Sequence, residues 1–273
     1  MKTLLICHED APLHREGMAR WLASFSKVAG IVVLDEAWGA RWRRARRELR
    51  RVGPVGFADM LTFRAYYKLF VAHRDRIWEA STLRRLSERY ASVPQDTPIL
   101  RTRSPNSVAC QRFIEECAPD ISLALCKTIL KPQVFSIPSR GTFVCHPGTC
   151  PEYRNAHGCF WALVNRDLDK VAMTLLRIDA GVDTGPVYGH YTYPFDELSE
   201  SHVIIQQRVV LENLDALQQK LTAIASDVAK PIDTSGRPSA MWGQPRFTSY
   251  AKWKSRARRE TRKASESPRT ALS

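Results

Sequence analysis

Short apolar runs alternate with helical patterns along most of this chain, and this alternation constrains the fold more than any other feature. An apolar run at Thr3–Cys7 precedes His14–Ser26, where apolar residues recur at helical spacing, and a β-branched run at Val28–Leu34 follows. Runs of about four to eight apolar residues are typical of buried strands, whereas recurrence every three or four residues is typical of an amphipathic helix. The order strand, helix, strand predicts the opening of a βαβ unit.

The same alternation resumes after residue 96. Ser104–Ser107 has the composition of a helix start, and the apolar positions of Leu198–Ala225 predict one long helix. Further strands are predicted at Thr97–Leu100, Ile121–Leu125, Gly141–His146, Val171–Ile178 and Val187–Tyr193. We therefore predict an α/β fold with a doubly wound, mostly parallel sheet over residues 1–225, and a ligand site just beyond the carboxyl ends of its strands.

Basic residues concentrate in two stretches. Ala40–Tyr90 carries 14 Lys/Arg against 5 Asp/Glu, a net charge of +9, and Arg246–Ser273 carries 9 against 2, a net charge of +7. The rest of the chain carries 18 against 21, a net charge of −3. The first stretch predicts a basic helical insertion at about residues 38–92. The second belongs to a C-terminal extension, residues 226–273, for which we expect aromatic anchors up to Trp253 and a disordered basic end.

These basic segments have three interpretations: a solvated surface, a site for RNA or another polyanion, and a membrane-surface contact. Charge runs usually face water, but arginines interleaved with Tyr66 and Tyr67 are also typical of nucleic-acid binding. The stretch Arg41–Arg51 is basic on nearly every face, which argues against an amphipathic membrane helix.

Composition excludes several classes of protein. No apolar run approaches the roughly 18 residues of a membrane span, and the apolar start meets His8, Glu9 and Asp10 too early for a secretory signal. The seven cysteines form no CxxC pair, which favours reduced thiols over a disulfide framework. We therefore expect a cytoplasmic protein without a membrane span.

Two polar segments follow predicted strands. Val144–Arg154 reads VCHPGTCPEYR, and Asp179–Val187 reads DAGVDTGPV. His146 is the strongest acid/base candidate because an imidazole titrates near neutral pH, although a turn hydrogen bond before Pro147 is the simpler explanation for a histidine there. Asp183 is either a general base or an Asx-turn residue that orders its own loop.

Together these segments resemble the catalytic domain of the folate-dependent formyltransferases, the family that includes methionyl-tRNA formyltransferase, glycinamide ribonucleotide transformylase and the sugar amine formyltransferases. The resemblance covers about residues 97–193. It consists of a strand, His-Pro-Gly, Pro-x-Tyr-Arg and, about thirty residues later, Asp-x-Gly-Val-Asp-Thr-Gly-Pro. It implies a Rossmann-like domain that transfers a formyl group from 10-formyltetrahydrofolate to an amine acceptor.

The resemblance also implies roles for individual residues. In this family an Asn, a His and an Asp converge on the formyl carbon, and here His146 matches the His and Asp183 matches the Asp. The position of the Asn is occupied by Val144, and loss of one oxyanion donor typically lowers a rate by about 10²- to 10³-fold. Asn155 and the nearby His157 are candidates for a substitute donor.

A folate site made mainly by backbone groups is a further implication of the resemblance. By position it comprises two segments, Cys126, Lys127, Thr128, Ile129 and Leu130, and Asp179, Ala180, Gly181 and Val182. Core packing is an additional explanation for Ile129 and Leu130.

Other chemistries are disfavoured. A cluster of thiols and imidazoles has a spacing that matches no usual zinc pattern, so we predict no metal. Its members are Cys145, His146, Cys150, His157 and Cys159. A nucleophilic Cys145 is also disfavoured, because neighbouring residues on a strand point to opposite faces. No GxGxxG or P-loop motif occurs.

Three functions follow from these observations. The first is a formyltransferase with His146 and Asp183 in catalytic roles. The second, motivated by Val144, is a catalytically degenerate family member that binds folate or a polyanion. The third uses water as the acceptor, which makes the protein a formyltetrahydrofolate hydrolase.

Overall fold

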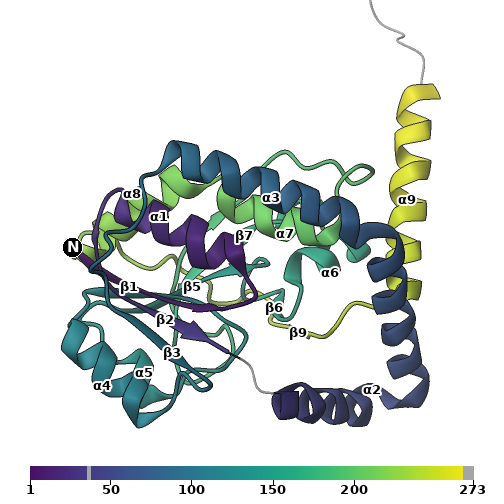
Figure 1. Ribbon diagram of the computed structural model, residues 1–273. Helices are drawn as coiled ribbons and strands as arrows, with labels where there is room; N and C mark the ends of the chain where they lie inside the picture. The colour runs from purple at the N-terminus through teal and green to yellow at the C-terminus, as the bar shows by residue number, and fades with distance from the viewer. Residues whose placement is uncertain (36–37, 267–273) are drawn as a thin grey trace, which may run out of the picture.

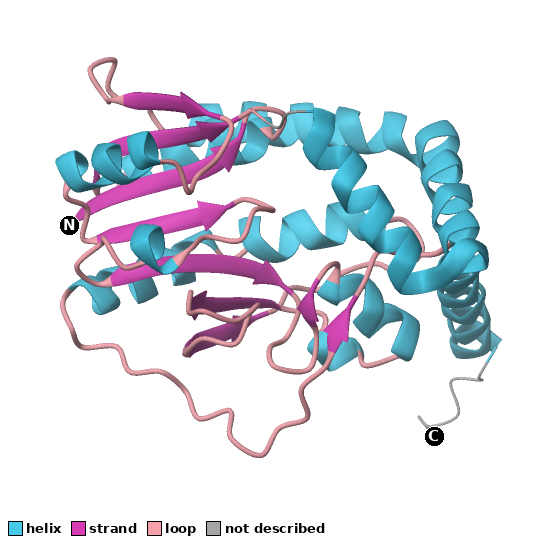
Figure 2. Cartoon of the chain, turned by 90° about the horizontal axis from the view of Figure 1, so that it is seen from below, coloured by secondary structure: helices cyan, strands magenta, loops and turns pink. Residues whose placement is uncertain are grey.

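One sheet of seven strands lies at the centre of the computed structural model, which describes residues 1–35 and 38–266. The strand order is β3-β2-β1-β4-β5-β7-β8 (Figure 2). Neighbours from β3 to β5 run parallel, whereas β7 runs antiparallel to both β5 and β8. The strands are β1 Lys2–His8, β2 Lys27–Leu34, β3 Ile99–Thr102, β4 Ile121–Leu125, β5 Gly141–Pro147, β7 Met173–Arg177 and β8 Val187–Tyr191.

Helices cover both faces of this sheet: α1, α3, α7 and α8 lie over one face, and α4 and α5 lie over the other (Figure 1). Leu5 and Cys7 of β1 belong to the core of the first face, while Leu4 and Ile6 belong to the core of the second. A strand that is apolar at every position must be covered on both sides, because successive side chains point to opposite faces. The predicted doubly wound, mostly parallel α/β fold is thus confirmed.

The helices that pack around the sheet are short. Their bounds are η1 Leu13–Met18, α1 Ala19–Ala23, α3 Ala72–Arg89, α4 Val108–Cys117, α5 Pro132–Phe135, α6 Gly158–Asn165, η3 Leu168–Lys170, α7 His202–Leu211 and α8 Leu214–Ala225.

The basic insertion is helical, as predicted. It consists of α2 Trp38–Tyr66, η2 Tyr67–Val71 and α3, and α2 changes direction at Gly53, whose φ of 71° favours glycine. A buried carboxylate joins the insertion to the sheet domain. Asp75 accepts hydrogen bonds from the hydroxyl of Tyr67 at 3.0 Å and from that of Ser201 at 2.5 Å.

The prediction of one long helix over Leu198–Ala225 is wrong, because two helices, α7 and α8, occupy this region. Ser201 begins α7 by accepting the backbone N–H of Ile204 at 3.1 Å. Asn213 lies in the break, where its side-chain Nδ2 donates to the carbonyl oxygen of Val209 at 2.9 Å. Such local side-chain hydrogen bonds offer the backbone an alternative to the continuing helix.

The C-terminal extension is more ordered than predicted. Helix α9 Phe247–Glu266 continues past Trp253, where a disordered end was expected, and residues 267–273 lie outside the described chain. Trp253 and Ala257, one turn apart, are 0% and 2% exposed, so the helix has an apolar stripe that the basic composition concealed. Among the described residues, no helix is both long and apolar enough to cross a membrane.

Candidate active site

His146 and Asp183 lie side by side. His146, near the end of β5, is 5% exposed, and its Nδ1 lies 3.4 Å from Oδ2 of Asp183. Its Nε2 lies 2.8 Å from the carbonyl oxygen of Tyr153. A carbonyl oxygen can only accept, so Nε2 carries a proton and Nδ1 is the ring nitrogen that faces the carboxylate. The structure therefore brings together the two residues that the sequence singled out as acid/base candidates.

Asp183 reaches this position by a route that the sequence did not indicate. Both polar segments were expected beyond strand ends at one edge of a parallel sheet, but β7 is antiparallel to β5, and Arg177 at its end pairs with Phe143 near the start of β5. The loop 178–186 must therefore run back along the sheet before Asp183 can meet His146.

Two neighbouring residues hold this loop in place. Arg154 donates from Nη1 to the carbonyl oxygen of Val182 at 3.1 Å, and Asn155 donates its backbone N–H to Oδ2 of Asp183 at 2.8 Å. The side chain of Asn155 turns away, because its Nδ2 donates to the carbonyl oxygen of Trp242 at 2.6 Å. Asn155 therefore contacts the candidate pair through its backbone, and its carboxamide is engaged elsewhere.

Two glycines set the position of the Tyr153 carbonyl. A Cβ placed on Gly148 would lie 2.7 Å from both the Cα of Gly158 and the oxygen of Tyr153, and a Cβ on Gly158 would lie 2.5 Å from the Cα of Gly148. The obstructing atoms are backbone, so they cannot yield as a flexible side chain would. The same close approach that requires glycine thus presents Tyr153 to His146.

Val144, which stands where the resemblance predicts an asparagine, belongs to a row of apolar side chains that crosses the sheet. Val144 pairs with Leu176, and Leu176 pairs with Val187, across three antiparallel strands. Together with Cys150, these side chains form a small apolar cluster. Directly paired residues point to the same face of a sheet, so this row contributes no oxyanion donor beside His146.

The first predicted folate segment, residues 126–130, is anchored at both ends. Lys127 donates its backbone N–H to Nε2 of His8 at 3.0 Å, and the side chain of Asn106 donates to the carbonyl oxygen of Ile129 at 2.9 Å. Leu130 is 4% exposed and packs in the core, whereas Ile129 is 64% exposed. Core packing therefore accounts for Leu130 but leaves Ile129 at the surface.

The second predicted folate segment, residues 179–182, is a loop ordered by its own side chains. Oδ1 of Asp179 accepts the backbone N–H of Gly181 at 2.9 Å and the hydroxyl of Thr184 at 2.7 Å. Ala180 and Gly181 are exposed. Ile178, which precedes this loop, packs against the same apolar cluster as Leu130, so the two segments flank one part of the core.

The remaining thiols and imidazoles of this region are buried and uncharged. Burial raises the pKa of the Cys145 and Cys159 thiols to about 12, which disfavours a thiolate nucleophile. Burial and the nearby charge of Lys127 lower the pKa of His157 to about 4, and its buried Nδ1 has no hydrogen-bond partner. In the described part of the chain, no three His, Cys, Asp or Glu side chains are placed to hold a metal ion.

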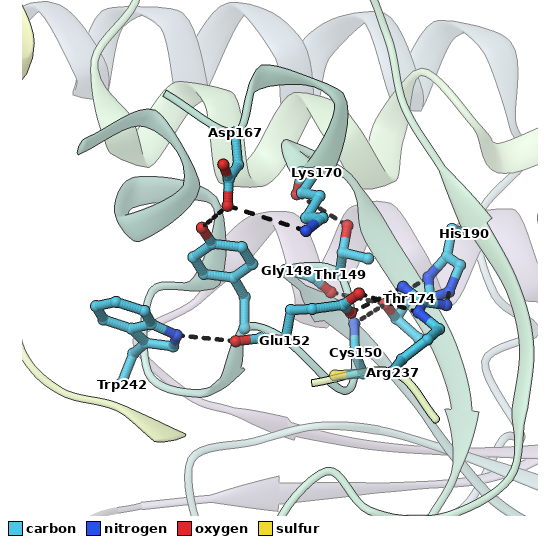
Figure 3. A network of polar contacts seen from close by, with 11 residues as sticks. Gly148, Thr149, Cys150, Glu152, Asp167, Lys170, Thr174, His190, Arg237 and Trp242 are labelled. Atoms are coloured by element: carbon cyan, nitrogen blue, oxygen red, sulfur yellow. Dashed lines mark hydrogen bonds and ion pairs between the residues drawn. The ribbon is translucent and has the colours of Figure 1, made fainter. Parts of the chain in front are cut away.

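A network of polar contacts beside His146 was not indicated by the sequence (Figure 3). Thr174 donates to the carbonyl oxygen of Gly148 at 2.7 Å, and its oxygen lies 3.0 Å from Nδ1 of His190. Nη1 of Arg237 lies 2.9 Å from Nε2 of His190, and the same guanidinium binds both carboxylate oxygens of Glu152, at 3.0 and 2.8 Å. Residues 85 positions apart thus hold the loop that follows His146, and no local pattern reveals such a pair.

The tautomer of His190 follows from this arrangement. A guanidinium can only donate, so Nε2 of His190 accepts from Arg237 and Nδ1 carries the proton toward Thr174. Burial and the positive charge of Arg237 lower the pKa of His190, with Glu152 acting in the opposite direction. His190 is therefore a neutral connecting residue.

The C-terminal extension also forms part of the site. Strand β9 Met241–Trp242 pairs in parallel with β6 Arg154–Asn155. The ring of Trp242 stacks on Tyr153 and on Trp161, with ring centroids 5.4 and 5.1 Å apart. Its indole N–H donates to the carbonyl oxygen of Glu152 at 2.9 Å. Trp242 thus fixes the segment whose carbonyl group binds His146.

Comparisons with known sequences find distant relatives of this chain. No family profile matches the chain. Methionyl-tRNA formyltransferase from Bacteroides thetaiotaomicron is 26% identical over 141 residues, which cover 52% of this chain and 43% of that protein. The enzyme of the same name from Dehalococcoides mccartyi is 35% identical over 79 residues, which cover 29% of this chain and 25% of that protein. The chain thus spans less than half the length of these curated relatives.

Solved structures share the fold. A sugar N-formyltransferase from a Shewanella species aligns with a TM-score of 0.52 at 13% identity, over 89% of this chain and 77% of that one. A phosphoribosylglycinamide formyltransferase from Anaplasma phagocytophilum aligns with a TM-score of 0.51 at 13% identity, over 89% of this chain and 98% of that one. This chain is therefore distantly similar in sequence to methionyl-tRNA formyltransferases, and it shares its fold with solved formyltransferases.

Proposed function

We propose that this protein transfers a formyl group from 10-formyltetrahydrofolate to an amine, with residues 1–225 as the catalytic domain. The observation that carries the proposal is the 3.4 Å approach of His146 Nδ1 to Asp183 Oδ2 in a chain that resembles this family. This separation is longer than a hydrogen bond and short enough for both groups to contact one reacting centre.

The reaction balances with the groups present. The amine nitrogen attacks the formyl carbon, and the carbonyl oxygen becomes an oxyanion. Because Nε2 of His146 already donates to Tyr153, His146 stabilises this oxyanion from Nδ1, in the protonated form of the ring. Asp183 accepts the proton that the nitrogen loses, the bond from the carbon to the folate nitrogen breaks, and that nitrogen takes the proton. The products are a formamide and tetrahydrofolate. A neighbouring imidazole and carboxylate supply the electrostatic and proton-transfer parts of this scheme.

The oxyanion has one donor fewer than the family pattern provides. Val144 occupies the asparagine position, and the Asn155 carboxamide is bonded to Trp242. Loss of one such donor lowers kcat by about 10²- to 10³-fold in other enzymes. We therefore propose a slow transferase in which His146 carries the oxyanion alone.

The donor is proposed to bind between residues 126–130 and 179–182, which flank one apolar cluster. Calorimetry and thermal unfolding with a non-transferable folate analogue test this assignment, because a ligand that binds the folded state must raise its stability. An unchanged melting temperature at saturating analogue would contradict it.

One experiment separates the three candidate functions. The protein is incubated with 10-formyltetrahydrofolate in single-turnover amounts, with and without a panel of amines. Consumption that requires an amine supports the transferase, and consumption without an amine supports a hydrolase. If a folate analogue binds but 10-formyltetrahydrofolate is not consumed, the protein is a binding protein without catalytic turnover. His146→Asn serves as the matched inactive control.

A second candidate function is polyanion binding, and it is favoured by the way the two basic segments pack together. Asp59 of α2 accepts the backbone N–H of Thr248 at 3.1 Å and its hydroxyl at 2.5 Å, so the insertion caps the start of α9. The aromatic ring of Tyr66 packs against those of Phe247 and Tyr250, with ring centroids 5.3 and 5.4 Å apart. Helices α2 and α9 lie side by side (Figure 1). Basic residues that are distant in sequence therefore belong to one pair of adjacent helices, which supports a composite surface for RNA.

The cellular compartment remains a proposal. All seven cysteines are free thiols, and all seven lie in the sheet domain, between Cys7 and Cys159. Unpaired thiols persist in a reducing compartment, which supports the expected cytoplasmic location.

A further inference from the structure

A cavity of about 250 Å³ adjoins Asp183 on the side of the C-terminal extension. It lies between the loop that carries Arg154, the loop that carries Asp183 and Thr184, and the segment with Thr234, Arg237 and Ser239. Three hydroxyl groups, two guanidinium groups and one carboxylate therefore border this space, together with the apolar side chains of Pro151 and Val187. A second hollow, lined by Met1 and Arg140, lies by the amino-terminal ends of the strands, away from these loops.

The two guanidinium groups of the smaller cavity differ in their partners. Arg237 is neutralised by Glu152, with which it forms two hydrogen bonds. Arg154 donates only to the carbonyl oxygen of Val182, and its buried Nε has no hydrogen-bond partner. In residues 1–35 and 38–266, no carboxylate lies within ion-pair distance of Arg154. The cavity thus holds one uncompensated cation.

An unpaired cation and an unmade hydrogen bond are both unfavourable away from water. A buried donor without a partner is rare in folded proteins and calls for an explanation such as an absent ligand. A bound oxyanion would both neutralise the charge of Arg154 and accept the hydrogen bond that its Nε does not make. The guanidinium presents several N–H donors in a plane that matches a carboxylate or phosphate. Asp183, on the same cavity, supplies the opposite charge.

We propose that this cavity receives the acceptor of the proposed formyl transfer, and that the acceptor is a small zwitterionic amine whose oxyanion binds Arg154 and whose nitrogen lies at Asp183. The inference rests on the proposed function for the identity of the reaction. The volume lies below the roughly 300–1,000 Å³ of sites for drug-sized ligands, which favours a molecule the size of an amino acid over a nucleotide derivative. The hydroxyl groups of Thr184, Thr234 and Ser239 supply further hydrogen-bond partners.

The chemistry remains balanced with such an acceptor. An ammonium group first releases one proton to solvent, and the resulting amine attacks the formyl carbon. Its second proton passes through Asp183 to the departing folate nitrogen, as described above. The oxyanion bound to Arg154 takes no part in bond breaking and only orients the nitrogen.

Binding can be measured without the folate donor. The probes are β-alanine and O-phosphoethanolamine, which represent a carboxylate and a phosphate, with propylamine and propionate as half-ligands. Titration at constant ionic strength, followed by calorimetry and melting temperature, is expected to show saturable binding of at least one zwitterion and binding about tenfold weaker or more for each half-ligand. Arg154→Gln is expected to weaken the zwitterion about tenfold or more, since it removes a charge-assisted hydrogen bond.

Two further variants keep the result interpretable. Arg140→Gln makes the same substitution in the other hollow and is expected to leave zwitterion binding unchanged. Arg154→Lys keeps the charge but loses the planar donor pair, so we expect an affinity between those of the native protein and Arg154→Gln. If Arg154→Gln does not fold cooperatively, Arg154→Lys replaces it in the test. Absence of saturable binding in the native protein, or equal binding in the Arg154 variants, would overturn the proposal.

The donor is tested separately. If the zwitterion binds through Arg154 while a folate analogue leaves the melting temperature unchanged, the cavity assignment stands and the formyl-transfer function fails. If the analogue binds and no zwitterion does, the function stands and the acceptor class is wrong.

Discussion

The carbonyl oxygen of Tyr153 accepts a hydrogen bond from Nε2 of His146 over 2.8 Å. This contact places a proton on Nε2 and leaves Nδ1 facing Asp183. Tyr153 in turn is stacked on Trp242, so the position of the carbonyl group that orients His146 depends on a residue of the C-terminal extension.

Replacement of either member of the pair is expected to remove turnover while preserving the fold. Asp183→Asn keeps an oxygen that can accept the backbone N–H of Asn155 but loses the proton acceptor, and a fall of about 10²- to 10⁴-fold in kcat is expected. Single-turnover consumption of 10-formyltetrahydrofolate measures the effect. Full activity of Asp183→Asn would exclude the carboxylate as the base, and a cooperative urea transition confirms that folding is intact.

Gly148→Ala is expected to destabilise the protein by about 1–3 kcal/mol, because the added methyl group meets backbone atoms at 2.7 Å. The displaced Tyr153 carbonyl should also lower activity more than the loss of stability explains. Gly17→Ala is the matched control: its methyl group also meets an atom at 2.7 Å, but that atom ends the flexible side chain of Leu86. Equal losses of unfolding free energy in both variants would contradict the backbone explanation.

Val144→Asn restores the family donor. If the missing oxyanion donor limits the rate, kcat rises by up to about 10²-fold, and a modest decrease in melting temperature accompanies the loss of the apolar contact with Leu176 and Val187. Val144→Ala removes the same bulk without adding a donor and should show no gain. A rate for Val144→Asn no higher than that of Val144→Ala would show that another group already stabilises the oxyanion.

Buried histidines predict a loss of stability in mild acid. Burial lowers the folded-state pKa of His157 and of His14 to about 4, from an ordinary value of 6.5. Between these values the unfolded chain binds protons that the folded chain excludes, so the free energy of unfolding falls as pH decreases from about 6.5 toward 4. Urea unfolding at several pH values measures the slope.

His157→Asn should flatten that slope, because it removes one of the groups that titrate only on unfolding. Asparagine also tolerates the left-handed backbone of this position, where φ is 57°. The exposed His73 provides a control, and His73→Gln should leave the slope as in the native protein. An unchanged slope in His157→Asn would show that its imidazole is not the group responsible.

The paired basic helices predict a salt-dependent affinity for RNA. Each phosphate contact that is lost lowers the slope of log affinity against log salt by about 0.7–0.9. Replacing the exposed Arg258 and Arg259 of α9 by Gln should reduce both the affinity and this slope, whereas Arg140→Gln should change neither. Weak binding that is independent of salt would identify the basic surface as merely solvated.

The strands were predictable because their signal is local. A run such as Ile121–Leu125 is buried at every position, and its boundaries agree with the structure. The antiparallel direction of β7 was not predictable, since Val171–Ile178 has the same apolar pattern in either orientation. Trp253 was expected as an anchor, but the burial of Ala257 and the continuation of α9 to Glu266 were missed, because seven arginines and lysines dominate the composition of this helix.

The candidate site, too, was predictable only where the signal in the sequence is local. His146 and Asp183 were identified from their motifs, and the structure places them together. The bonds from Arg237 to Glu152 and His190 join segments that carry no shared motif, and each residue alone is an ordinary surface type. Long-range polar pairs of this kind depend on topology, which a single sequence does not specify.

The parallel pairing of β6 with β9 has a consequence for synthesis on the ribosome. The sheet and the His-Pro-Gly loop leave the ribosome well before Arg237 and Trp242, which hold that loop in its final form. A nascent chain can therefore complete most of its hydrophobic core while the candidate site is still open. The candidate site is then completed late, when Trp242 stacks on Tyr153, and a nascent chain that has not reached Trp242 lacks this contact.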